Sequence, residues 1–285
     1  MILAQVIVGG LLIGAVYALL SSGLTLIWGM MNVINFAHGE FVMLGMYVAF
    51  FAFTLLHAGP AGFSALAAVF LFGLGVLVYV LLVRHVMRGP MLAQILSTFG
   101  LLLFLRYAAY WAFSAEFLTL PEGLFGPSLN AGGLLISAPK LAAGVVAIAI
   151  TLFMHVMITR TALGSRFLAV AEDRQAAMLM GIRPGRMEAL AWGLAGASAG
   201  VAGALIATFF PISATVGESL ALVAFVVVTL GGFGSVPGAL IAGLVIGLIE
   251  SVSAYYFGPV YQDVFVYGLF VLILWVRPHG FLGKA

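Results

Sequence analysis

Long uncharged runs alternate along the chain with short segments that hold most of its polar residues. No Asp, Glu, Lys or Arg occurs before Glu40, and none occurs between Glu40 and Arg84. A membrane-spanning helix needs about 20 predominantly apolar residues, so each of these runs has room for one or more spans. The pattern predicts nine helices, over residues 4–29, 40–56, 62–83, 90–114, 140–159, 188–209, 218–232, 236–257 and 262–276.

Apolar residues run all round each predicted helix rather than along one face. Such helices are buried in a bundle or in lipid, whereas a β-barrel would show short segments of alternating polarity. The expected fold is therefore an all-α polytopic membrane protein with about eight to nine transmembrane helices, broken or re-entrant segments among them. No hydrophilic linker divides residues 1–285, so we expect a single transmembrane domain.

Composition narrows the function classes. Hydrophobic residues make up 64% of the 285 positions and charged residues 7%, against about a quarter charged in soluble domains. A soluble enzyme, a nucleic-acid binder and a sizeable aqueous domain are therefore excluded. The absence of cysteine excludes disulfides and thiolate metal sites.

The sequence also lacks the ATP-binding and metal-binding motifs that a transport engine or a metalloprotease needs. The one Gly-Lys pair, Gly283-Lys284, has neither the earlier Gly nor the Ser/Thr of a P-loop. We therefore expect no cofactor on this chain, and ATP hydrolysis that drives transport would belong to another polypeptide. His38 and Glu40 are too close in sequence for the zinc-binding H-E-x-x-H pattern, so no metal is expected either.

Positive residues predict the orientation of the chain. Short cytoplasmic loops are rich in Lys and Arg, and five arginines share the 160–187 loop. The 115–139 loop instead carries Glu116 and Glu122, with Pro127 between the predicted helices. This distribution predicts a cytoplasmic C-terminus and an N-terminus outside. The positive residues used are Arg84, Arg88, Arg160, Arg166, Arg174, Arg183, Arg186, Arg277 and Lys284.

Two polar or Gly-rich segments interrupt the apolar pattern, one in each half of the chain. They are Asn35-Phe-Ala-His-Gly-Glu40 and Gly231-Gly-Phe-Gly-Ser-Val-Pro-Gly238. Broken segments at matching places in two halves are typical of transporter repeats, with the substrate path near the breaks; ordinary helix-connecting turns are the alternative. In the first segment, Asn35 would then cap a helix whose positive N-terminus lies near Glu40.

Arg106 lies inside the predicted 90–114 helix, about two-thirds of the way toward the outer face. Ionisable residues within membrane spans are functional candidates by default, and a guanidinium can bind a carboxylate of a substrate through paired hydrogen bonds. A structural role is the alternative, in which Arg106 pairs with Glu116 or Glu218 or reaches the outer headgroups. Glu218 and Glu250 are predicted to lie near the outer ends of helices, and no chemical role is assigned to them.

Gly196-Ala-Ser-Ala-Gly200 matches the G-x-S-x-G pattern of serine hydrolases. That motif needs a strand-to-helix elbow, whereas these residues lie inside a predicted helix. The same spacing allows close helix packing in membranes, and it recurs at Gly10/Gly14, Gly234/Gly238 and Gly243/Gly247. Packing is therefore favoured over an intramembrane serine protease.

The 160–187 loop is the longest charged segment between the predicted spans. Residues 166–181 are predicted to form one short helix with mixed apolar and polar faces, ended by Gly181. A solvated connector is the alternative. The apolar residues that such a connector would expose favour a docking surface.

Four segments together resemble permeases of the branched-chain amino acid type (hydrophobic amino acid uptake) within the ABC importers. The hallmark is Asn35-Phe-Ala-His-Gly-Glu40 followed by Phe41-Val-Met-Leu-Gly45. The other three are Ala171-Glu172-Asp173 through Met180-Gly181-Ile182, Leu230-Gly-Gly-Phe-Gly-Ser-Val-Pro-Gly238, and Val276-Arg277-Pro278-His-Gly280. They occur from residue 35 to residue 280, so the resemblance covers nearly the whole chain.

The resemblance implies a transport subunit, not an enzyme, in a bacterial-type inner membrane. It implies two ATPase subunits, a second related permease chain or a copy of this one, and an extracytoplasmic solute-binding protein. Residues implied to couple to the ATPase are Ala171, Glu172, Asp173, Arg174, Met180, Gly181 and Ile182. Residues predicted to form the translocation path or gate are Asn35, His38, Glu40, Arg106, Gly232, Gly234, Ser235 and Pro237.

The solute stays open at this point. The wider family carries branched-chain and other amino acids, amides, urea and aromatic carboxylates, and its specificity rests largely on the binding protein. Arg106 has no counterpart in the resemblance; facing the path, it would favour a carboxylate-bearing solute over urea. A stand-alone channel or secondary transporter is the competing function, but a secondary transporter often needs intramembrane acidic residues, and a channel needs no docking helix.

Overall fold

The computed structural model describes residues 2–87, 89–121, 124, 126, 128–131, 134–277 and 280–282. Predictions that involve Arg88, Glu122, Pro127, Pro278, His279, Gly283 and Lys284 lie outside the described residues.

Helices make up nearly all of the regular structure. Their bounds are α1 (Ile2–Met31), α2 (His38–Leu56), α3 (Pro60–Val78), η1 (Tyr79–Val83), α4 (Arg84–Val86), α5 (Met91–Phe113), α6 (Ala138–Arg160), α7 (Ala162–Glu172), α8 (Arg174–Leu179), α9 (Pro184–Ile206), α10 (Val216–Gly231), α11 (Val236–Phe257), η2 (Pro259–Tyr261) and α12 (Gln262–Val276). Within the described chain, eight helical segments are long and apolar enough to cross a membrane, and α10 is a shorter apolar helix. The prediction of an all-α polytopic protein is confirmed.

Proline and glycine set many of the helix ends. The helices α3, α6, α9 and α11 each carry a proline in the first turn, where its missing N–H costs no hydrogen bond. Gly232 and Gly258, both at a φ of 93°, follow the ends of α10 and α11. Each of the nine predicted spans matches a helix. The predicted start of α9 at 188 is late, because Pro184 already begins that helix.

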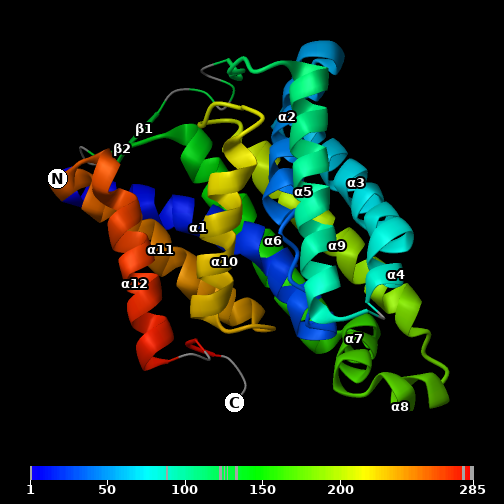
Figure 1. Cartoon of the computed structure of the whole chain (residues 1–285). Helices are drawn as coiled ribbons and strands as arrows, with labels where there is room; N and C mark the ends of the chain where they lie inside the picture. Colours follow the sequence, from blue (N-terminus) through cyan, green and yellow to red (C-terminus); the bar gives the residue numbers. More distant parts are fainter. Residues whose placement is uncertain are drawn as a thin grey trace.

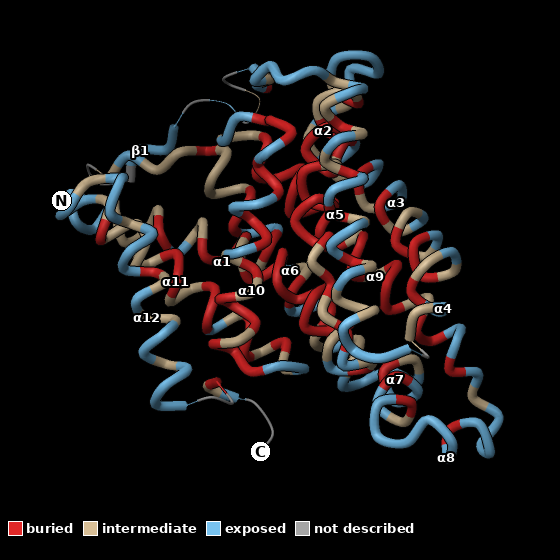
Figure 2. Tube along the Cα trace, viewed as in Figure 1, coloured by how far each residue is buried: buried red, intermediate tan, exposed pale blue. Residues whose placement is uncertain are grey.

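Helix α9 is the most buried of the long described helices, and small residues allow close contacts between helices of the bundle. Gly10 and Gly14 on α1 face Gly243 and Gly247 on α11: a Cβ added at Gly14 would lie 2.5 Å from the Gly243 carbonyl oxygen. Such close approach is the physical basis of small-residue packing in membranes. Figure 2 shows α9 mostly buried and α12 mostly exposed, so α12 lies at the periphery.

The G-x-S-x-G segment lies inside α9 and serves packing. Gly200 packs against α3, where an added Cβ would lie 2.6 Å from the Ala67 carbonyl oxygen. Ser198 is buried and donates a hydrogen bond to the Ala195 carbonyl oxygen at 2.9 Å. The helix-packing interpretation is therefore confirmed, and the strand-to-helix elbow of a serine hydrolase is absent from these described residues.

The two ends of the bundle carry different structures (Figure 1). Helices α7 and α8 extend beyond the long helices at one end. At the opposite end the strands β1 (Leu129–Ala131) and β2 (Leu134–Ile136) pair antiparallel, with Leu129 opposite Ile136. This hairpin was not predicted, because its strands are three residues long and fall below the length at which alternation is readable.

Candidate translocation site and coupling surface

The segment between α1 and α2 folds back along α1 instead of leaving the bundle. Nε2 of His38 donates a hydrogen bond to the Leu20 carbonyl oxygen, with 2.8 Å between the two atoms. Because Leu20 lies near the middle of α1, α2 begins deep in the bundle. Non-helical backbone at membrane depth is tolerated only where protein buries it or water reaches it. We call residues 32–37 the re-entrant segment, because here the chain turns back along α1 within the bundle; the broken pattern left this open beside an ordinary helix-connecting turn.

Asn35 stabilises this segment but does not cap α2 as predicted. Its Oδ1 accepts a hydrogen bond from the Ala37 amide at 3.1 Å. The N-cap position belongs to Ala37, which has no side-chain capping bond. Asn35 instead forms an Asx turn just before the N-cap position, where the chain reverses direction before α2 begins. Asn35 and His38 are fully buried.

Three charged residues from α2, α5 and α10 meet near the start of α2. We call Glu40, Arg106 and Glu218 the charged cluster. Nη2 of Arg106 lies 2.8 Å from Oε1 of Glu40, and its Nε donates to the same oxygen at 3.1 Å. Nη1 of Arg106 lies 2.9 Å from Oε2 of Glu218. The predicted pairing with Glu218 is confirmed. Glu116, the alternative partner, is not paired with Arg106 among the described residues, and Glu40 is a partner that was not predicted.

Glycine at two positions lets α10 approach the start of α2. A Cβ added at Gly39 would lie 2.7 Å from the Ala221 Cβ and would also collide with the Gly217 carbonyl oxygen. A Cβ added at Gly217 would lie 2.7 Å from Oε2 of Glu40. Only residues without a side chain allow this spacing. The charged cluster therefore depends on both glycines.

Exposure differs sharply across the charged cluster. The Glu40 side chain is 1% exposed, that of Arg106 15% and that of Glu218 64%. Glu218 lies in the first turn of α10 and shares the Arg106 guanidinium with the buried Glu40. Its exposed carboxylate is therefore better matched to a polar environment than to lipid. The face that α5 and α10 share suits water or another protein chain instead.

The second Gly-rich segment lies elsewhere in the bundle. The Gly231–Gly238 turn sits beside the end of α1, where the rings of Trp28 and Phe233 are 4.4 Å apart. Ser235 caps α11 by accepting a hydrogen bond from the Gly238 amide at 3.1 Å. His38, by contrast, contacts the middle of α1. The two predicted path segments therefore do not form one site, although both contact α1.

The predicted coupling segment forms two helices instead of one. Asp173 separates α7 from α8, and its Oδ1 accepts hydrogen bonds from the amides of Gln175 and Ala176 at 2.8 and 3.0 Å. This N-cap starts a new helix, and that is why the single 166–181 helix was wrong. Gly181, at a φ of 79°, follows the end of α8 as predicted.

The surface of α8 is apolar and exposed at its far end. Leu179 is 90% exposed and Met180 81% exposed, whereas Ala177 is buried against the bundle. Exposed contiguous apolar side chains mark interaction surfaces. The predicted coupling residues Ala171, Glu172, Asp173, Arg174 and Met180 are all exposed in the chain, and Ile182 is partly buried.

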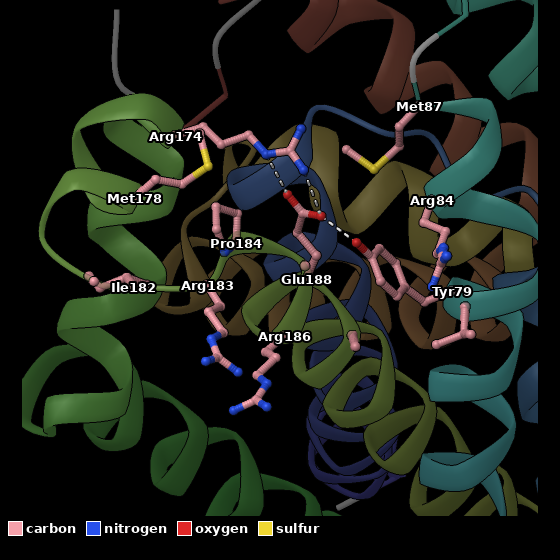
Figure 3. Close-up of a pocket in the computed structure, with 14 residues that line it drawn as sticks. Tyr79, Arg84, Met87, Arg174, Met178, Ile182, Arg183, Pro184, Arg186 and Glu188 are labelled. Atoms are coloured by element: carbon pink, nitrogen blue, oxygen red, sulfur yellow. Dashed lines mark hydrogen bonds and ion pairs between the residues drawn. The ribbon is translucent and has the colours of Figure 1, made fainter.

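A buried carboxylate ties α8 to the transmembrane helices. Glu188 of α9 is 2% exposed and accepts a short hydrogen bond from the hydroxyl of Tyr79 in η1. Nε of Arg174, the first residue of α8, lies 3.2 Å from Oε1 of Glu188. Figure 3 shows Tyr79 and Arg174 reaching this carboxylate from two sides. We call these three residues the α8 anchor.

Sequence reasoning did not find the α8 anchor. The predicted helix over 188–209 begins at Glu188, and no role was predicted for that residue. In the structure it lies one turn inside α9, on the face that packs against η1. The sequence does show a tyrosine near the end of an apolar run and an acidic residue after the 160–187 loop. No fixed spacing links two such residues, so their pairing could not be predicted.

The described residues form eight long apolar helices, with a buried charged cluster and a short exposed apolar helix at one end, an arrangement that fits a polytopic membrane protein. A protein family described as the permease component of branched-chain amino acid transport systems matches residues 6–274. The chain belongs to this family.

Curated relatives cover almost the full length. The high-affinity branched-chain amino acid transport system permease protein BraD of Pseudomonas aeruginosa is 34% identical over 98% of this chain and 95% of its own. The corresponding LivH of Escherichia coli K12 is 31% identical with the same coverage. A probable LivH of Methanocaldococcus jannaschii is 27% identical over 98% of this chain and 92% of its own. No solved structure matches the chain significantly.

These comparisons confirm the resemblance drawn from the four motifs. The relatives are transport components and not enzymes, as expected from the sequence. They support a permease component of a larger transport system, and they give no support to a stand-alone channel or secondary transporter.

Proposed function

We propose that this chain is the transmembrane subunit of an ATP-driven importer for branched-chain or related amino acids. The observation that carries the proposal is the match to permease components over nearly the whole chain. Residues 1–285 would act as one permease domain. ATP would be bound and hydrolysed by partner chains, so this chain would need no cofactor of its own.

The translocation path would run along the face that α5 and α10 share. Support comes from Glu218, whose exposed carboxylate on this face pairs with Arg106 and is better matched to a polar environment than to lipid. A second related permease chain, or a copy of this one, would cover this face and complete the path. Asn35, His38, Glu40 and Arg106 would shape its middle. The turn containing Gly232, Gly234, Ser235 and Pro237 would shape the end toward α7 and α8.

Coupling would occur at α8 and the residues around it. Leu179 and Met180 offer an exposed apolar surface on a helix that the α8 anchor holds against the bundle. Each of the two ATPase subunits would bind this surface on one permease chain. Ala171, Glu172, Asp173 and Arg174 would lie along one side of the contact, and Gly181 and Ile182 would follow it.

The proposed membrane is the inner membrane of a bacterial-type cell. The arginines between α6 and α9 favour a cytoplasmic position for α7 and α8. The C-terminus would then be cytoplasmic and the N-terminus outside. An extracytoplasmic solute-binding protein would deliver its amino acid at the opposite end, where the β1–β2 hairpin lies.

Co-purification tests this function most directly. The full chain is extracted from its native membrane in mild detergent, with Leu179→Asp and Met180→Asp variants in parallel. We expect the wild type to retain P-loop ATPase chains and the variants to lose them, because a charge in a desolvated contact is costly. Val260→Asp, at an 85% exposed position on η2, is the matched control and should retain them. ATP-independent solute flux by the chain alone in liposomes would overturn the proposal.

A further inference from the structure

A groove of about 900 Å³ opens beside the α8 anchor, between the end of the α3–η1–α4 segment and the start of α9. Apolar side chains line part of it, including Val80 and Met87. Four arginines also line it, namely Arg84, Arg174, Arg183 and Arg186. We call this hollow the cationic groove.

The cationic groove has a large excess of positive charge. Among its described lining residues, Glu188 is the one carboxylate, and Arg174 and Tyr79 already bind it. In the part of the chain that the structure describes, no carboxylate lies within ion-pair distance of Arg84, Arg183 or Arg186. In Figure 3 the guanidinium groups of Arg183 and Arg186 extend away from Glu188. Three guanidinium groups are therefore available to an external anion.

The orientation of the chain in the membrane does not explain why these arginines line one groove. A positive loop satisfies the positive-inside rule wherever its arginines point, and Arg160 and Arg166 are exposed in the same loop without lining the groove. Arg84 comes instead from the first half of the chain and lines the same groove as Arg183 and Arg186 from the second half. The first turn of α9 also borders the groove, and its free amides carry partial positive charge.

The position of the groove selects the kind of anion. Arg84 lies two residues before the end of the apolar segment Pro60–Val86, which is the level at which arginines reach the headgroup region. Leu77 and Leu81 on the same segment are 50% and 66% exposed. They lie about one turn apart on this segment, which passes through the π-helical turn η1 before it reaches Arg84. Exposed apolar side chains therefore continue along this segment up to the level of Arg84.

We propose that the cationic groove binds the phosphate of an anionic phospholipid from the adjoining leaflet, with an acyl chain along Leu77 and Leu81. Basic pockets between transmembrane helices on the cytoplasmic side are suited to such headgroups. The bound phosphate connects the end of α4 to the α8–α9 turn, next to the α8 anchor. This lipid site does not depend on the transported solute.

Native mass spectrometry of the full chain tests the site. Purified protein is exchanged into detergent containing phosphatidylglycerol or phosphatidylcholine, and bound lipid per chain is counted. We expect wild type to retain phosphatidylglycerol preferentially. Arg183→Gln/Arg186→Gln should weaken that retention about thirtyfold, given the contribution of each arginine near an anionic lipid. Arg160→Gln/Arg166→Gln removes two charges from the same loop and should leave retention unchanged.

Three outcomes would overturn the proposal. Equal losses in both double variants would mean general charge attraction and not a site. Displacement of the lipid by millimolar inorganic phosphate would mean a small-anion site. Loss of the lipid whenever ATPase chains are bound would mean that an acidic segment of the partner occupies the groove. The single variant Arg84→Gln, on a different helix, repeats the test if the double variant does not fold, and it should also lose retention.

Discussion

Tyr79 and Glu188 are 109 positions apart in the sequence and joined by a buried hydrogen bond. Arg174 binds the same carboxylate from the start of α8. The exposed helix α8 is thus fixed to two membrane helices through one acidic side chain. Because Glu188 is buried, we expect a displacement of α8 to act on η1 and α9 through these two contacts.

Tyr79→Phe should uncouple transport from ATP hydrolysis. The substitution keeps the ring and removes a donor from a buried carboxylate, at a cost of about 1–3 kcal/mol. We expect at least a fivefold fall in solute moved per ATP hydrolysed by the reconstituted complex, with ATPase chains still bound. Tyr255→Phe, at an exposed position on α11, is the control. A fall in uptake and ATP hydrolysis by the same factor would point to a merely structural role.

We expect the main effect of Arg106→Gln to be a loss of stability, and not a change in substrate choice. It leaves the buried Glu40 without its ion-pair partner, and breaking a buried pair from one side costs about 3–5 kcal/mol. Glu218→Gln should cost less than about 1 kcal/mol, because that pair is largely exposed. Thermal unfolding in detergent measures both effects.

The double variant Glu40→Gln/Arg106→Gln separates stability from recognition. Neutral amides replace both charges, so most of the lost stability should return. If Arg106 also selects carboxylate-bearing solutes, the double variant should still take up carboxylates poorly relative to amides. Restored uptake with an unchanged preference between carboxylates and amides would assign Arg106 to structure alone.

Gly39→Ala should push α10 away from α2. The new methyl group would meet Ala221 and the Gly217 carbonyl oxygen, and overpacking of this kind costs about 1–3 kcal/mol. Gly73→Ala on α3 is the matched control, since an added Cβ there meets nothing within 4 Å. Thermal unfolding should separate the two variants. Equal midpoints would show that the α2–α10 contact can relax.

The helices were predictable because their signal is local. The length of each uncharged run fixes how many spans fit in it, and residues 236–257 and 262–276 match α11 and α12 to the residue. The hairpin and the short π-helical turn η1 escaped, because five or fewer residues carry no period that a sequence pattern can reveal.

The site was predictable only in parts. Glu40 and Arg106 each stood out as charges in apolar surroundings, but their pairing requires the re-entrant segment that carries α2 to the level of Leu20. Nothing in the spacing of 66 positions encodes that depth. The break at Asp173 was within reach, since Asp is a common N-cap, but the continuous amphipathic pattern of 166–181 concealed it.

Asp173 should act through its capping bonds and not through its charge. Asp173→Ala removes the acceptor for the amides of Gln175 and Ala176, at a typical cost of about 1 kcal/mol. Asp173→Asn keeps a capping oxygen and loses the charge, so it should behave like wild type. We expect faster hydrogen exchange over residues 174–180 and weaker ATPase co-purification in the Ala variant only. If Asn and Ala variants lose ATPase chains equally while exchange stays slow, the carboxylate itself contacts the partner, and α8 does not depend on its cap.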